Sequence, residues 1–265
     1  MKSVLRSFGI IVGVLFVYLA FTALPFLFIE DKMIGSMVGL TTCSVILGMI
    51  FYWTRTPTAM PISISPYYLF MIILMMVATY FIANYGIASV MSYLFPSQSD
   101  QLNDYFDVTS LTGRGFILFF LVTCLVGPFV EEVMFRGLIY EALRKVLPVW
   151  PAVLLQALLF GAMHMNVVQG TFALPVGIVL GIIYARSNRL WLVVTLHVLC
   201  NAYSAVVNKF WPEISDFNFS TFTTSEIVLF GVVLTVGGIV LIYAYRKFTI
   251  YWEKSQGKTA QKVIN

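Results

Sequence analysis

Long apolar runs, separated by short polar stretches, follow one another along most of the chain. A helix that crosses a bilayer needs about 20 apolar residues, because the hydrocarbon core is roughly 30 Å thick. The runs lack the two-residue alternation of outer-membrane barrel strands, so we expect an all-α, polytopic membrane protein. The pattern predicts eight transmembrane helices, the sixth of them short, over residues 8–29, 33–53, 67–93, 115–135, 150–168, 172–186, 190–208 and 225–245.

Composition agrees with this interpretation. The 265 residues are 60% hydrophobic and 11% charged, with a mean hydropathy of +0.90, whereas about a quarter of a soluble domain is charged. The first run is too long for a signal-peptide core and has no clear cleavage site, so we interpret it as a helix. With no long linker, residues 1–265 are expected to form a single transmembrane domain, and nothing favours nucleic-acid binding.

The basic residues predict an orientation. With eight spans, thirteen of the sixteen Lys and Arg residues fall on the side that holds both chain ends, and three fall on the other. Because cytoplasmic loops are enriched in Lys and Arg, both termini are expected in the cytoplasm of a multi-pass protein of the cell membrane. The basic tail, residues 246–265, fits the same asymmetry, with contact to anionic lipid as the alternative.

Two adjacent carboxylates interrupt the fourth run. A carboxylate inside a membrane segment is costly and therefore indicates function, with a partner to be named. Glu132 and Arg136 are spaced i and i+4, which predicts an ion pair that supports the site. Glu131 is turned about 100° away and has no such local partner, so we interpret it as a base. The alternative for Glu132 and Arg136 is a purely structural ion pair. Pro128 predicts a kink or restart of the helix beside the glutamates.

The two histidines of the chain also lie in apolar runs. His164 follows Phe160 by four residues, and Asn201 follows His197 by four. His197 and Asn201 share one helix face, and both can donate hydrogen bonds to an oxyanion. The alternative is that these polar side chains only join helices to one another.

If these helix faces meet, they form a polar pocket within residues 115–208, the expected catalytic core. A carboxylate base with hydrogen-bond donors can activate water. Equally, Glu131, His164 and His197 could bind a divalent metal such as zinc. The rise per residue places Glu131 and His197 in the cytoplasmic half of the membrane, whereas His164 comes out deeper than they do.

Together the three motifs resemble those of the CPBP family, the CAAX proteases and bacteriocin-processing enzymes, also called Abi proteins. The residues are Glu131-Glu132-Val-Met-Phe-Arg136, Phe160-Gly-Ala-Met-His164 and His197-Val-Leu-Cys-Asn201. The resemblance implies an eight-helix intramembrane endopeptidase, metal-dependent or metal-free, in which Glu131 and His164 activate water and His197 with Asn201 stabilises the oxyanion. In that scheme Glu132, Arg136 and Phe160 support the site.

The expected function is therefore hydrolysis of a membrane-associated peptide or protein, lipidated or membrane-anchored, near the cytoplasmic face. For bacterial members the resemblance implies peptide maturation, bacteriocin immunity or peptide signalling. Two alternatives remain open at this point. A proton-coupled transporter could use Glu131 as its relay, although the chain shows no inverted repeat. A non-catalytic membrane scaffold could use the same pocket to bind a partner.

Overall fold

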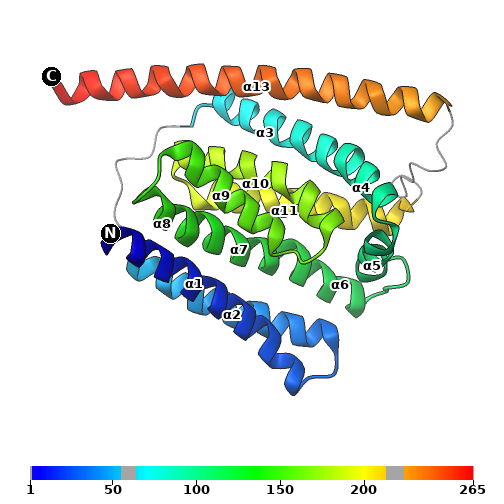
Figure 1. Ribbon diagram of the computed structural model, residues 1–265. Helices are drawn as coiled ribbons and strands as arrows, with labels where there is room; N and C mark the ends of the chain where they lie inside the picture. Colours follow the sequence, from blue (N-terminus) through cyan, green and yellow to red (C-terminus); the bar gives the residue numbers. More distant parts are fainter. Residues whose placement is uncertain (1, 55–63, 213–223, 265) are drawn as a thin grey trace.

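The computed structural model describes residues 2–54, 64–212 and 224–264, and every regular element in these ranges is a helix (Figure 1). The predicted all-α class is confirmed. The chain begins with a hairpin of two long helices, joined by a short 3-10 helix that contains Pro25. Its elements are α1 (Lys2–Ala23), η1 (Leu24–Leu27) and α2 (Lys32–Thr54).

The next helices form the walls of the molecule's central cavity. A third membrane helix contains a π-helical segment, an amphipathic helix follows it, and a fourth long helix contains two further π-helical segments. The third helix comprises α3 (Pro66–Phe81), η2 (Ile82–Ile87) and α4 (Ala88–Leu94), and is followed by α5 (Pro96–Phe106). The fourth comprises α6 (Arg114–Phe120), η3 (Leu121–Val126), α7 (Gly127–Glu132), η4 (Val133–Tyr140) and α8 (Glu141–Arg144).

After α8 the described residues form four helices, of which α9 packs against α10 and α13 packs against α3. In Figure 1, α10 lies inside the bundle, and α13 lies along α3 at its edge. Arg186, at the end of α10, donates a hydrogen bond of 2.7 Å to Thr249 of α13, which anchors this outer helix. The elements are α9 (Val149–Ala162), α10 (Val167–Ser187), α11 (Leu190–Phe210) and α13 (Thr224–Ile264).

The predicted spans need one correction. Within the described residues seven helices are long and apolar enough to cross a membrane, and α9, with 14 residues, is shorter. Its length of roughly 21 Å is less than the hydrocarbon thickness. The predicted span 150–168 therefore ends too late, and the predicted span 172–186 begins too late, because Asn166 caps the start of α10 by accepting a hydrogen bond from the Gln169 amide.

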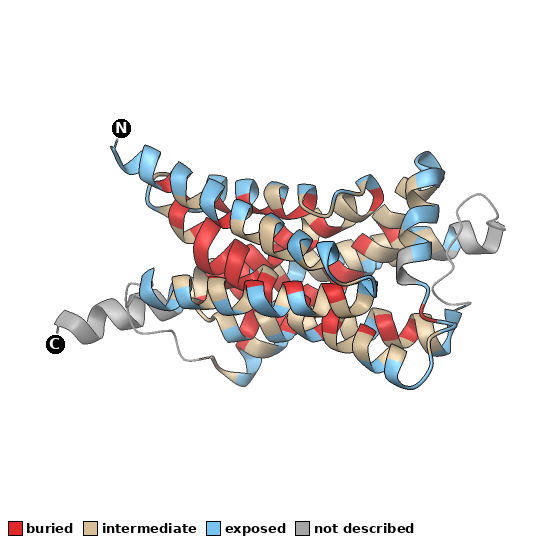
Figure 2. Cartoon of the chain, turned by 90° about the horizontal axis from the view of Figure 1, so that it is seen from below, coloured by how far each residue is buried: buried red, intermediate tan, exposed pale blue. Residues whose placement is uncertain are grey.

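Buried residues concentrate along the centre of the bundle, and the outer faces carry the exposed ones (Figure 2). Many of these outward side chains are large and apolar, for example Phe8, Phe16, Trp53 and Leu158. Such a surface suits lipid, and intrahelical hydrogen bonds satisfy the backbone, as a membrane requires. The chain is a multi-pass, all-α membrane protein.

Candidate active site

Glu131 and Glu132 lie near the middle of the fourth long helix. This helix runs from Arg114 to Arg144, well beyond the predicted end at residue 135, so Glu131 is 17 residues from its start and 13 from its end. The π-helical turn η3 ends at Val126, and a regular α-helical turn begins at Gly127 and Pro128. Because proline has no amide hydrogen, the change of helix type at this point agrees with the restart that Pro128 predicts.

The predicted pair of Glu132 and Arg136 is present and completely buried. A guanidinium nitrogen of Arg136 lies 2.8 Å from Glu132 Oε1, and both side chains are 0% exposed. The second terminal nitrogen of Arg136 donates to the Gly177 carbonyl on α10 at 3.1 Å. The guanidinium also lies 4.8 Å from the ring centroid of Phe160. The arginine therefore ties three helices together around one carboxylate.

Gln156 is a part of this buried layer that sequence reasoning missed. Its amide nitrogen donates to the same Gly177 carbonyl at 2.9 Å, and its side chain is fully buried. A single amide in the middle of the apolar run 150–168 was the available signal. Gly177 and Gly181 lie where α9 and α10 touch: a Cβ at Gly177 would lie 2.9 Å from the Phe160 ring.

His197 contacts both glutamates, and sequence reasoning did not predict these contacts either. Its Nδ1 lies 2.8 Å from Glu132 Oε1, and its Nε2 lies 3.7 Å from Glu131 Oε2. A carboxylate oxygen can only accept, so Nδ1 donates its hydrogen to Glu132. Glu132 is thus shared between Arg136 and His197, and it fixes the orientation of the imidazole ring.

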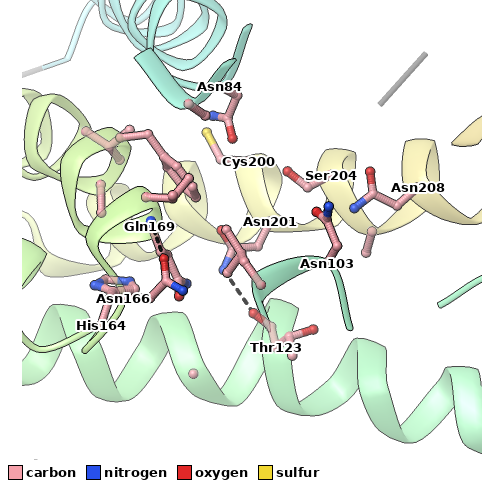
Figure 3. Close-up of a pocket in the computed structure, with 18 of the residues that line it drawn as sticks. Asn84, Asn103, Thr123, His164, Asn166, Gln169, Cys200, Asn201, Ser204 and Asn208 are labelled. Atoms are coloured by element: carbon pink, nitrogen blue, oxygen red, sulfur yellow. Dashed lines mark hydrogen bonds between the residues drawn. The ribbon is translucent and has the colours of Figure 1, made fainter. Parts of the chain in front are cut away.

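Glu131, His164, His197 and Asn201 all line one cavity of about 940 Å³. The side chain of Glu131 is 22% exposed, whereas that of Glu132 is sealed beneath it. Figure 3 shows His164, Asn201 and Thr123 around this cavity, with Asn201 donating to the Thr123 carbonyl at 2.9 Å. The structure therefore brings the predicted residues together, and their chemical roles stay predictions.

His164 occupies the turn between α9 and α10. Its Nδ1 lies 2.8 Å from the Phe160 carbonyl oxygen, which can only accept, so Nδ1 is the donor. In the neutral ring this leaves Nε2 as an acceptor. The ring of Phe160 packs edge-on against both histidines, with centroid distances of 4.9 Å to His164 and 5.9 Å to His197.

Close packing of two glycines places this turn. A Cβ on Gly161 would lie 2.7 Å from the Gly170 carbonyl oxygen, and the reverse contact is equally short. Met165, between His164 and Asn166, has a left-handed backbone with φ of 56°, a conformation that is uncommon outside glycine. Because α9 is short and the fourth helix is long, His164 and Glu131 reach the same cavity, and the depth conflict of the sequence prediction disappears.

Three of these residues, Glu131, His164 and His197, are also the predicted ligands of a divalent metal. In the part of the chain that the structure describes, no group of three His, Cys, Asp or Glu side chains is arranged to hold a metal ion. Glu131 and His197 are neighbours, and the Phe160 ring packs edge-on against both His197 and His164. Glu131, His164 and His197 as arranged do not fit a three-ligand zinc site, and the zinc prediction stays a prediction.

Comparison with known proteins agrees with the motifs. The family model described as type II CAAX prenyl endopeptidase Rce1-like matches residues 113–203. This central segment is therefore similar to that family. This match contains all three motifs, from Glu131 to Asn201, and confirms the predicted resemblance to the CPBP family.

One curated relative comes from Bacillus subtilis (strain 168) and is named "Putative membrane peptidase YdiL". The two are 29% identical over 140 residues, which cover 51% of this chain and 56% of the relative. The chain therefore matches about half the length of that protein. No solved structure matches the chain.

Proposed function

We propose that the chain is an intramembrane endopeptidase that hydrolyses a peptide bond of a membrane-associated peptide or protein. One observation carries the proposal: Glu131 is open to the cavity beside His197, while Glu132 is buried in an ion pair. The two adjacent carboxylates thus have different surroundings, and only Glu131 can reach water and a substrate in the cavity. The similarity of residues 113–203 to CAAX prenyl endopeptidases supports the same reaction.

Glu131 acts as the general base in this mechanism. It takes a proton from a water molecule, and the resulting hydroxide attacks the carbonyl carbon of the scissile bond. His164 assists, since its Nδ1 is engaged by the Phe160 carbonyl and Nε2 is left to accept a hydrogen from the water. When the tetrahedral intermediate collapses, the carbon–nitrogen bond breaks, and the proton held by Glu131 passes to the leaving nitrogen.

His197 and Asn201 stabilise the oxyanion. Asn201 uses one amide hydrogen for the Thr123 carbonyl, which fixes the side chain, and the second hydrogen can donate to the intermediate. His197 donates from Nδ1 to Glu132, so its Nε2 donates in the imidazolium form. Glu132, Arg136 and Phe160 act as positioning residues that hold this ring.

The substrate class is a peptide or protein at the bilayer, lipidated or otherwise anchored to the membrane. Peptide maturation, bacteriocin immunity and peptide signalling are the roles that the family resemblance suggests. A proton-coupled transporter and a non-catalytic scaffold remain the competing hypotheses.

Comparative mass spectrometry of membrane peptides tests the proposal. Cells that produce the wild-type chain, Glu131→Gln or Glu253→Gln are compared at equal protein levels; Glu253 is an exposed carboxylate on α13. We expect cleavage products to be lost in Glu131→Gln and retained in Glu253→Gln. If the two variants give the same peptides as the wild type, the chain is not a peptidase acting through Glu131.

A further inference from the structure

The cavity extends from the glutamates toward only one end of the helices. On α11 it is lined by His197, Cys200, Asn201, Ser204 and Asn208, a single helix face that continues to two residues before the helix ends (Figure 3). His197 and Asn208 are 11 residues apart, or roughly 16 Å along the helix. The lining face thus leads from the buried histidine toward the end of α11 beside α5.

The opposite end of the cavity is closed. Its floor is formed by Met134, Phe135 and Phe160, each at most 2% exposed. Beneath them lies the buried layer of Glu132, Arg136 and Gln156, each 0% exposed. No described residue of α8 or α13 lines the cavity. Water and substrate therefore have no route to Glu131 through this packed layer.

The mouth of the cavity lies at α5. Three exposed residues of this amphipathic helix, Asp100, Gln101 and Asn103, belong to the lining. The helix is attached to the start of α10, since Asn166 donates to the Gln98 carbonyl at 2.8 Å. The segment after α5 is attached to the end of α11, where Lys209 donates to the Thr109 carbonyl at 2.8 Å.

Side chains along this route suit a peptide. Amides at Asn84, Asn103, Asn166, Gln169 and Asn208 can both donate and accept, as backbone peptide groups require. The charged lining residues are Glu131 and Asp100, and among the described residues that line the cavity there is no Lys or Arg. The route therefore favours a neutral or basic peptide segment over an acidic one.

Charge distinguishes the two ends of the molecule. In Figure 1 the first turn of α1 and the C-terminal part of α13 lie at the same end of the molecule, away from α5. That end carries nine described basic residues and two acidic ones: Lys2, Arg6, Arg144, Lys145, Arg186, Arg189, Arg246, Lys247 and Lys254 against Glu141 and Glu253. The α5 end carries three basic and five acidic ones: Lys32, Arg114 and Lys209 against Glu30, Asp31, Asp100, Asp104 and Asp107.

We propose that the cavity opens to the outer side of the membrane and takes its peptide from that side. Basic loops stay in the cytoplasm, so the end with the termini is cytoplasmic and the α5 end is outside. The sequence predicted both cytoplasmic termini and cleavage near the cytoplasmic face. In this structure the two predictions conflict, because the cavity opens at the end of the bundle opposite the termini. The charge asymmetry supports the prediction of cytoplasmic termini. That the occupant is a peptide rests on the proposed function, whereas the direction of the opening does not.

Cysteine labelling in a bacterial host tests this direction. Cys43 and Cys124 are fully buried, so Cys200→Ala removes the one native thiol that lines the cavity. In that background Asn103→Cys reports on the mouth, and Lys145→Cys, exposed on the segment between α8 and α9, is the matched control. Intact cells and permeabilised cells are treated with a membrane-impermeant maleimide.

We expect Asn103→Cys to be labelled in intact cells and Lys145→Cys only after permeabilisation. The reverse pattern would overturn the proposal. A C-terminal green fluorescent protein fusion of the unmutated chain gives an independent answer, since we expect it to fluoresce, and a dark fusion at normal protein level would contradict the orientation. Neither measurement depends on peptide cleavage, so this inference and the proposed function can fail separately.

Discussion

Replacing Arg136 by methionine should destabilise the protein through the carboxylate that it leaves behind. Arg136 and Glu132 are 0% exposed and 2.8 Å apart, and the Arg136→Met side chain would fill similar space without charge. Removing one partner of a buried ion pair costs about 3–5 kcal/mol, because the remaining charge stays in a low-dielectric site. His197 would still donate to Glu132 at 2.8 Å, and Gln156 would still donate to the Gly177 carbonyl.

The double variant Glu132→Gln/Arg136→Met separates this explanation from a simple loss of packing. A glutamine at position 132 can still accept the hydrogen of His197 Nδ1 but carries no charge. Since buried ion pairs replaced by neutral groups of similar volume are often no less stable, most of the lost stability should return.

Thermal unfolding of the detergent-solubilised protein, monitored by size-exclusion chromatography after heating, measures the loss of stability in Arg136→Met and its recovery in the double variant. At about 2–4 °C per kcal/mol for a chain of this size, the single variant should unfold roughly 10 °C below the wild type. If the double variant is no more stable than Arg136→Met, or if Arg136→Met unfolds at the wild-type temperature, the buried charge is not what the arginine compensates.

Three further predictions concern packing, turnover and metal. Gly161→Ala should cost about 1–3 kcal/mol in the same thermal assay, because its Cβ would meet the Gly170 backbone; Gly48→Ala, with open space around it, should not. Asn201→Ala should lower turnover about 10²–10³-fold if it holds the oxyanion, whereas Thr195→Ala on the exposed face of α11 should not. The zinc prediction expects a chelator to abolish activity and added zinc to restore it; full activity in chelator would contradict it.

Most of the fold could be predicted because hydropathy alone identifies long membrane helices. The third span, predicted at 67–93, is Pro66–Leu94 in the structure. The end of α9 was misplaced because Met163, Met165 and Val167 continue the apolar run. The break depends instead on the capping side chain of Asn166. Close contact between Gly161 and Gly170 also requires two helices, so no local pattern reveals it.

Within the candidate site, local geometry was predictable and long-range contact was not. Glu132 and Arg136 are one helical turn apart, so the spacing alone predicts their ion pair. His197 is 65 residues from Glu132, and its hydrogen bond depends on how α11 packs against the fourth helix. Gln156 was missed for the same reason, since its partner Gly177 lies on the neighbouring helix.

The π-helical turn at Leu121–Val126 sets the direction in which Glu131 points. Thr123 and Glu131 both line the cavity although they are eight residues apart, a spacing that an ideal α-helix would rotate about 80° out of phase. The wider turn takes up the surplus residue and brings the two side chains back into phase. If the same residues formed a regular α-helical turn instead, the carboxylate would rotate about 100° relative to Thr123, with length, hydropathy and all three motifs unchanged. A relative could therefore keep every sequence feature of this site and still have a helix that aims its glutamate at lipid.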